Sequence, residues 1–307
     1  TIGTAEISNW TSSQVAALST RYLDALTTAS LASLNSAQLP GLTTAQMVAL
    51  TLEQAAAIKA TQVPSLSTAQ LAAMEVRDVT KLTTAAIAAL TTAQISALTT
   101  AQMVSLTDVQ LAAIETADLA NLSTAQIASI TSAQVVNLTT QQIQALTIAQ
   151  AGALTSAQAP SLSVSQLQSI ETQDLAQMST SSVKSLSADQ AKNLTTDQVA
   201  ALTTAQIAAI ETAKFAQLST AQIVSFTSQQ MAGLTTAQLG NMTSAQVAAL
   251  ETRDVVSLST AQLQALTTAQ MSQLTTAHVA NLTTSQVATL ETADVAVLTN
   301  AHVAAFT

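Results

Sequence analysis

The sequence has 307 residues, of which 48% are hydrophobic but only 2% aromatic and 8% charged, with a net charge of −9 and no cysteine. Eight lysines and arginines scattered over an acidic chain offer no basic surface for nucleic acid, and the lack of cysteine excludes disulfides and thiolate metal sites. Serine, threonine or glutamine interrupts every apolar run, so no stretch of 18 apolar residues is present to insert into a membrane.

One eight-residue pattern runs from Ile2 to Ala305 without insertion or deletion, which makes 304/8 = 38 octads with the consensus L-T-T-A-Q-I-A-A. We number each octad from the large apolar residue that precedes the Ser/Thr pair. All seven methionines, the tryptophan and the three phenylalanines lie at position 1 or 6. A repeat that keeps its register over this length indicates a repeat protein rather than a domain with ordinary loops.

Neither a long helix nor a strand fits the octad. At about 100° per residue the apolar face of one long helix would drift by about 80° per octad, and strand alternation fails because positions 1 and 6 differ in parity. Ser or Thr at position 2, in 29 of the 38 octads, and Gln at position 5, in 25, instead match the helix capping box. Positions 1 and 6 match the hydrophobic staple, so the pattern predicts a short helix that begins anew in each octad.

Helices this short are unstable alone, so neighbouring octads must bury the two large apolar side chains that each octad offers. We therefore predict an all-α solenoid of very short helices, one per octad, as a single continuous domain over residues 1–307. We expect the Thr of position 3 to face solvent, and the Gln of position 5 to do so in part.

Three prolines, Pro40, Pro64 and Pro160, depart from the consensus, and all three lie at position 7. Proline would break a long helix there, but a helix that is about to end loses much less. Asn at position 8, as in Asn121 and Asn193, also favours termination before the next corner.

Six octads carry Glu at position 2, at intervals of 40, 56, 40, 40 and 40 residues. Five of them also carry Asp at position 5, and the sixth carries Lys214 there. Because 40 residues are five octads, this interval predicts about five octads per superhelical turn, with four or six as alternatives.

These acidic octads have three interpretations: a modified helix cap, a lateral strip that binds another chain, or a column of Ca²⁺ sites. The last is disfavoured because Ca²⁺ needs six to eight oxygens at one point. The residues of the predicted lateral strip are Glu75, Asp78, Glu115, Asp118, Glu171, Asp174, Glu211, Glu251, Asp254, Glu291 and Asp294.

His278 and His302 both lie at position 5, where we expect them to replace Gln on the surface. Two histidines without a third ligand do not predict a metal site. The sequence offers no nucleophile–base–acid set and no Gly-rich phosphate loop. It therefore predicts no catalytic residues, no cofactor and no enzymatic activity.

Tandem octads such as "LTTAQISALTTAQMVSL" (residues 90–106) resemble the repeat regions of very large proteobacterial secreted or cell-surface proteins, often described as adhesin-like. The resemblance covers essentially the whole chain and implies an extracellular or cell-surface location with a stalk, fibre or matrix role. The octads continue to Phe306, so we expect either a piece of a longer chain or end-to-end self-association.

We therefore predict a structural protein that forms a rigid extracellular rod, stalk or filament on a bacterial surface. An alternative is a scaffold that binds a protein or a surface polysaccharide through its Glu/Asp strip or its Thr-rich face. A further alternative is a protein that binds ice or another surface through its regular threonines.

Overall fold

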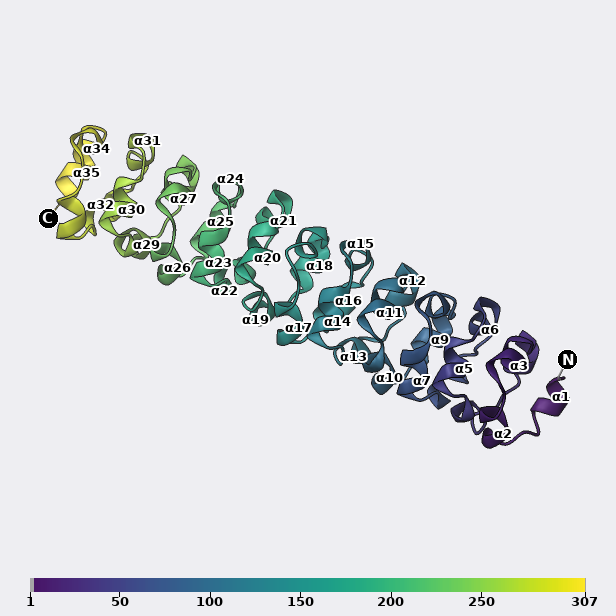
Figure 1. The fold of residues 1–307 in the computed structure, drawn as a ribbon. Helices are drawn as coiled ribbons and strands as arrows, with labels where there is room; N and C mark the ends of the chain where they lie inside the picture. The colour runs from purple at the N-terminus through teal and green to yellow at the C-terminus, as the bar shows by residue number, and fades with distance from the viewer. Residues whose placement is uncertain (1–2, 307) are drawn as a thin grey trace. The chain divides into compact units, whose positions relative to one another are not determined.

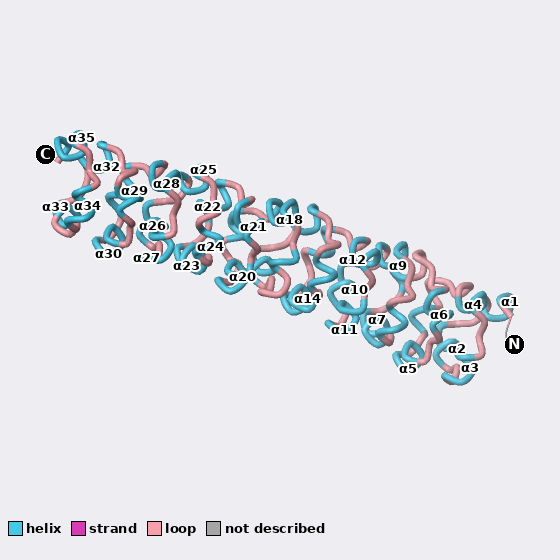
Figure 2. The backbone as a smooth tube through the Cα atoms, turned by 90° about the horizontal axis from the view of Figure 1, so that it is seen from above, coloured by secondary structure: helices cyan, strands magenta, loops and turns pink. Residues whose placement is uncertain are grey.

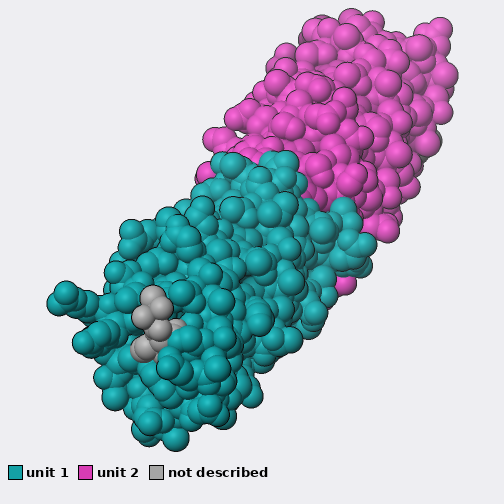
Figure 3. All heavy atoms as spheres, turned by 90° about the vertical axis from the view of Figure 1, so that its right-hand side faces the viewer, with its two compact units in different colours: residues 1–153 teal, residues 154–307 magenta. Residues whose placement is uncertain are grey.

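The computed structural model describes residues 3–306, and this range contains short helices and no β-strand. The chain divides into two compact units, residues 1–153 and residues 154–307 (Figure 3). Every α-helix in the described range has four to six residues and begins at position 3 of an octad. The prediction of an all-α solenoid with one short helix per octad is confirmed.

The first unit contains, in chain order, α1 (Thr4–Ile7), α2 (Ser12–Ala16), α3 (Thr20–Asp24), α4 (Thr28–Leu31), η1 (Leu39–Gly41), α5 (Thr44–Val48), α6 (Leu52–Ala56), η2 (Val63–Ser65), α7 (Thr68–Ala73), α8 (Val76–Val79), α9 (Thr84–Ala88), α10 (Thr92–Ala97), α11 (Thr100–Ser105), α12 (Asp108–Ala112), α13 (Thr116–Leu119), α14 (Thr124–Ser129), α15 (Ser132–Val135), α16 (Thr140–Gln144) and α17 (Ile148–Gly152).

The second unit contains η3 (Ala159–Ser161), α18 (Val164–Ser169), α19 (Thr172–Leu175), α20 (Thr180–Ser185), α21 (Ala188–Lys192), α22 (Thr196–Ala201), α23 (Thr204–Ala209), α24 (Thr212–Phe215), α25 (Thr220–Val224), α26 (Ser228–Ala232), α27 (Thr236–Gly240), α28 (Ser244–Ala248), α29 (Thr252–Ser257), α30 (Thr260–Gln264), α31 (Thr268–Met271), α32 (Thr276–Ala280), α33 (Thr284–Val287), α34 (Thr292–Ala296) and α35 (Asn300–Ala305).

The helices begin as the capping box predicts. At α11, the Thr99 hydroxyl accepts a hydrogen bond from the Gln102 N–H (3.1 Å), and the Gln102 side-chain oxygen accepts one from the Thr99 N–H (2.9 Å). Met103 and Leu106, at positions 6 and 1, are buried, whereas Thr100 at position 3 is exposed. Local sequence thus sets where each helix starts and which side chains enter the core.

Proline changes its octad more than we predicted. Where Pro40, Pro64 and Pro160 occupy position 7, no α-helix forms and the residues around each proline make a 3₁₀-helix instead. Proline has no N–H to donate to the carbonyl four residues earlier, and in so short a helix this is one of very few backbone bonds. The asparagines of position 8 act as predicted: the Asn121 amide donates to the Ala117 carbonyl (2.7 Å) and so helps to end α13.

Each unit winds as a solenoid in which helices three octads apart pack against each other. Figure 1 shows α7, α10 and α13 side by side in this way, and Figure 2 shows a loop at the corner between successive helices. Side-chain hydrogen bonds join residues 28 and 31 positions apart, for example Gln46 to Leu18 and to Val15. One turn therefore comprises between three and four octads, or 24 to 32 residues.

The prediction of about five octads per turn is wrong. The corner at positions 1 and 2 turns the chain more sharply than five octads per turn would require. The 40-residue interval of the Glu octads is thus a property of the sequence and does not match the winding. That the two units form one continuous solenoid stays a prediction. Among the described residues, no helix combines the length and apolarity needed to cross a bilayer.

Candidate functional site

The most regular polar feature of the interior is a row of glutamines at octad position 5. In a typical case, the Gln46 side-chain oxygen accepts a hydrogen bond from the Thr43 N–H (2.6 Å) and so completes the cap of its own helix. Its side-chain nitrogen donates to the carbonyls of Val15 and Leu18 in the previous turn (2.9 Å each). One amide therefore closes a helix start and joins two turns.

The same bonds recur along both units, from Gln38 to Gln150 in the first and from Gln190 to Gln286 in the second. We call this row the glutamine ladder. Of the 25 glutamines at position 5, 24 are buried, with at most 5% of the residue exposed. The expectation that these side chains face solvent in part is wrong, because their second role needs contact with the preceding turn.

The sequence itself indicates that the glutamine side chain bonds to the preceding turn, but an interpretation based on helix capping alone overlooks this. Glutamate serves as well as glutamine in a capping box, since both offer an oxygen to the backbone N–H. Position 5 nevertheless carries Glu only once, at Glu6, which is exposed and accepts from the Gly3 N–H (2.9 Å). A carboxylate has no hydrogen to donate to a backbone carbonyl, so the preference for Gln reports the bond between turns.

Ser182 and Lys214 replace glutamine in their octads and keep a bond to the previous turn. The Ser182 hydroxyl donates to the Leu154 carbonyl (2.7 Å), and the Lys214 ammonium donates to the Lys184 carbonyl (2.9 Å). Lys214 also forms an ion pair with Glu211 (3.3 Å). The octad that pairs Glu with Lys is therefore a variant of the same structural contact.

The histidines replace glutamine, as predicted, but inside the protein rather than on its surface. His278 Nδ1 accepts from the Thr275 N–H (3.1 Å), and His278 Nε2 lies 2.8 Å from the Leu250 carbonyl. Only the neutral ring with its hydrogen on Nε2 makes both bonds. Burial lowers the pKa of the His278 imidazole and favours this neutral form. His302 is also buried and accepts from the Thr299 N–H (3.2 Å).

The residues of the predicted acidic strip fall into two groups. The glutamates lie at the helix N-caps and are exposed, except that Glu75 is half-buried: Glu75, Glu115, Glu171, Glu211, Glu251 and Glu291. The aspartates lie in the ladder position and are buried: Asp78, Asp118, Asp174, Asp254 and Asp294. The glutamate side chains make no cap hydrogen bond. That they contact another chain stays a prediction.

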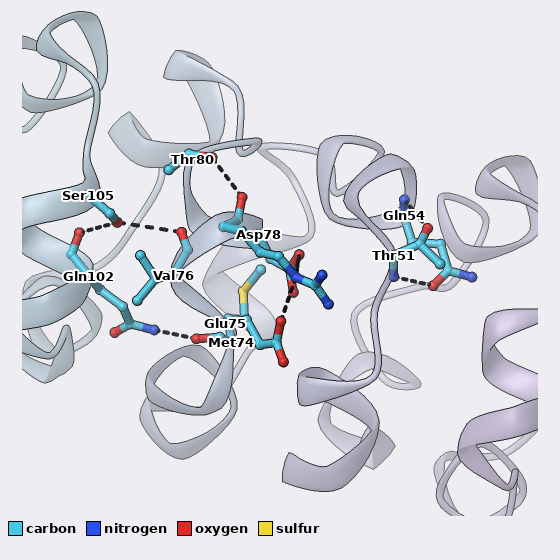
Figure 4. Close-up of polar contacts among 10 residues, drawn as sticks. Thr51, Gln54, Met74, Glu75, Val76, Asp78, Thr80, Gln102 and Ser105 are labelled. Carbon is cyan, nitrogen blue, oxygen red and sulfur yellow. Dashed lines mark hydrogen bonds and ion pairs between the residues drawn. The ribbon is translucent and has the colours of Figure 1, made fainter.

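The buried aspartates are poorly satisfied in the ladder position. Asp118 accepts a hydrogen bond from the Thr92 hydroxyl (2.6 Å), but one Asp174 oxygen, one Asp254 oxygen and both Asp78 oxygens have no hydrogen-bond partner. Figure 4 shows the Asp78 octad between the Thr51–Gln54 capping box and Gln102, which donates to the Met74 carbonyl. Aspartate thus leaves a defect in an otherwise satisfied row.

Burial sets the protonation behaviour of three of these aspartates. Desolvation raises the pKa of the Asp78, Asp174 and Asp254 carboxyls above the ordinary 3.8. The Arg77 charge opposes this shift at Asp78, and the hydrogen bond from the Glu251 N–H opposes it at Asp254. Among the described residues, no three His, Cys, Asp or Glu side chains lie close enough together to hold a metal ion.

Comparison with known proteins identifies the repeat but not a function. A family model described as the ALTTAQ repeat matches residues 20–52, 71–108, 111–148, 167–204, 207–244 and 247–284, which together make up more than half of the chain. No curated protein matches the sequence.

Proposed function

The chain belongs to the ALTTAQ repeat family, and we propose that, as a structural repeat protein, it forms a rigid extracellular rod, stalk or filament on a bacterial surface. The observation that carries this proposal is the glutamine ladder within each unit. Wherever position 5 carries Gln, one turn offers backbone carbonyls and the next turn supplies the side-chain donors in the same register. Such stacking repeats without change of geometry, which suits a part whose task is length and stiffness.

Apolar packing supports the same role. Side chains at positions 1 and 6 form the core of both units, and the largest of them, Phe215 and Phe226, contact each other with ring centroids 5.9 Å apart. Each core residue touches residues of its own and adjoining turns, so burial accumulates with every octad added. The exposed surface is mainly hydroxyl, amide and methyl groups, with few charges to attract a specific small ligand.

The particle shape tests this proposal directly. The full chain at low concentration, examined by negative-stain electron microscopy and small-angle X-ray scattering, should give elongated particles whose length far exceeds their width. Compact globular particles would overturn the proposal. For location, a surface protease applied to intact cells should remove the chain, while a cytoplasmic marker protein stays intact.

We further propose that the last turn of the second unit packs end to end against a second copy of the chain. Val287, Val295 and Val303, at position 6, are 36%, 46% and 52% exposed, whereas Val279 in the preceding turn is 1% exposed. Val287 and Phe306 line a hollow of about 400 Å³. An exposed apolar surface of this kind favours contact with a partner that resembles the next turn.

Analytical ultracentrifugation measures the contribution of a second copy. If copies stack, Val295→Asp should shift the chain towards monomer, because it places a charge in the contact. Val256→Asp, at a laterally exposed valine, is the matched control and should leave association unchanged. Equal association of both variants would contradict stacking through this turn.

A further inference from the structure

Two octads, one in each unit, share an unusual arrangement around a buried aspartate. Their sequences are "MEVRDV" and "LETRDV", with Asp78 and Asp254 at position 5, and both aspartates are 0% exposed. Asp78 has two side-chain oxygens without a hydrogen-bond partner and Asp254 has one. The second Asp254 oxygen accepts from the Glu251 N–H (3.0 Å), so this carboxyl keeps the cap role of glutamine.

The register of the ladder identifies what each carboxyl faces. Glutamines at this position donate to carbonyls 31 and 28 residues earlier, as Gln54 does to Leu23 and Leu26. The same offsets place Asp78 opposite the carbonyls of Met47 and Leu50. They place Asp254 opposite those of Ile223 and Phe226. An ionised carboxylate therefore meets backbone acceptors at a place where every glutamine supplies hydrogens, and the contact is repulsive.

In the first unit, the charged groups around Asp78 do not replace that hydrogen. Arg77 lies 3.9 Å from the carboxylate, beyond hydrogen-bond distance, and its Nε lies 2.5 Å from Glu75. Helix α8 packs against α6 and α11. Helix α6 carries one titratable residue, the exposed Glu53, and α11 carries none.

In the second unit, Asp254 has matching surroundings. Arg253 lies 3.7 Å from its carboxylate and pairs with Glu251 at 2.7 Å. Helix α29 packs against α26, which has no titratable residue, and against α32, which carries His278. The His278 ring already donates to the Leu250 carbonyl when neutral.

We propose that Asp78 and Asp254 are proton-operated contacts between turns. In the acid form, each carboxyl donates one hydrogen bond to a backbone carbonyl of the preceding turn, as the glutamine amide does at other ladder positions. In the ionised form, the carboxylate leaves that contact open, and the turns there separate more readily than elsewhere. The proton comes from solvent, so acidification tightens the solenoid at one defined layer in each unit.

The sign of the effect follows from the direction of the pKa shifts. Burial raises the pKa of both folded carboxyls above the unfolded value of 3.8. The acid form is therefore favoured by folding. The stabilisation is complete below pH 3.8 and is lost as the pH rises through the folded pKa.

Nuclear magnetic resonance of the unaltered full chain tests the proposal without a variant that could misfold. The side-chain carboxyl carbons of Asp78 and Asp254 should titrate above pH 3.8, the ordinary value for aspartate. Asp197, which is exposed at position 4 of its octad, is the site of a control substitution. In parallel, amide hydrogen-exchange protection in α8 and α29 should rise by about fivefold on acidification, the equivalent of about one added hydrogen bond. Protection in α11, whose ladder residue is Gln102, should not rise.

Substitution of the two aspartates by glutamine, and addition of calcium, extend the hydrogen-exchange experiment. Asp78→Gln and Asp254→Gln should give the high protection already at neutral pH and abolish its pH dependence, whereas Asp197→Asn should behave as the unaltered chain. Addition of CaCl₂ at pH 7 should leave protection in α8 and α29 unchanged. Titration of Asp78 and Asp254 at or below pH 3.8, or protection by Ca²⁺ at pH 7, would overturn the proposal.

Discussion

Residues 90–113 and residues 74–89 are neighbouring parts of the first unit that both form one short helix per octad but differ in their side-chain hydrogen bonds to the previous turn. In the former, every octad carries a ladder glutamine, such as Gln102. In the latter, Asp78 and Ala86 occupy the ladder position in two consecutive octads. The core continues through both regions, and Thr83 still caps α9 although Ala86 occupies the ladder position of that octad. Helix initiation and attachment between turns are therefore separate properties of the octad, and they meet at position 5.

The largest effect is expected where a ladder glutamine becomes a carboxylate. Gln102→Glu keeps the oxygen that caps α11 but loses the hydrogen bonds to Leu71 and Met74 (2.9 Å each) and buries a charge. We expect a loss of about 3 kcal/mol in the free energy of unfolding, since unsatisfied buried groups cost about 1–3 kcal/mol each. Urea denaturation at pH 7 measures this loss.

Gln14→Glu is the matched control for that substitution. Gln14 also accepts from a threonine N–H, that of Thr11 (2.8 Å), but its side chain is exposed. We expect a change of less than about 0.5 kcal/mol, as for surface substitutions away from such contacts. Equal losses for the two variants would mean that capping, and not the contact between turns, explains the preference for glutamine.

A gain should follow from completing the ladder in the weaker region. Ala86→Gln places an amide opposite the carbonyls of Ala55 and Ile58, at the offsets that the ladder uses elsewhere. We expect stabilisation by about 1–2 kcal/mol, the net value of one or two hydrogen bonds. Ala85→Gln, at the adjacent exposed position, is the control and should be close to neutral. Destabilisation by Ala86→Gln would show that the turns approach more closely here than in residues 90–113.

Loss of a cap hydroxyl should lower the free energy of unfolding equally in both regions. This would separate helix capping from the contacts between turns. The hydroxyls of Thr83 and Thr99 accept from the backbone N–H three residues on, at 3.1 Å in each case. Replacing either with alanine should lower the free energy of unfolding by about 1 kcal/mol. Thr100→Ala removes an exposed hydroxyl at position 3 and should have little effect. Unequal losses at Thr83 and Thr99 would mean that capping depends on the ladder after all.

The sequence predicts the parts of this architecture that lie within eight residues. The sequence predicts a cap at Thr99, a capping box with Gln102 and a buried staple residue at Met103, and the structure confirms all three. It does not predict the partner of the Gln102 amide, because the carbonyls of Leu71 and Met74 come near only after a full turn. The angle at each corner sets that distance, and no residue pattern encodes the angle directly. The regular spacing of the Glu octads therefore suggested the wrong number of octads per turn.

The smallest expected effect concerns the one ladder position in the second unit where His278 makes both bonds of a glutamine. Protonation adds a hydrogen to Nδ1, so the bond from the Thr275 N–H is lost while the one to the Leu250 carbonyl remains. The folded pKa of His278 lies below 6.5 because of burial, so its stabilisation is complete above pH 6.5 and falls as the pH drops through the folded pKa. His278→Gln should remove this loss, since an amide does not titrate. The difference between the thermal midpoint of the variant and that of the unaltered chain should therefore increase in favour of the variant as the pH falls from 7.5 to about 5. Protonation of Asp254 stabilises both proteins as the pH falls, so its contribution largely cancels in the difference between the two thermal midpoints. A difference that stays constant over this range would mean that the ring is not held as the neutral donor.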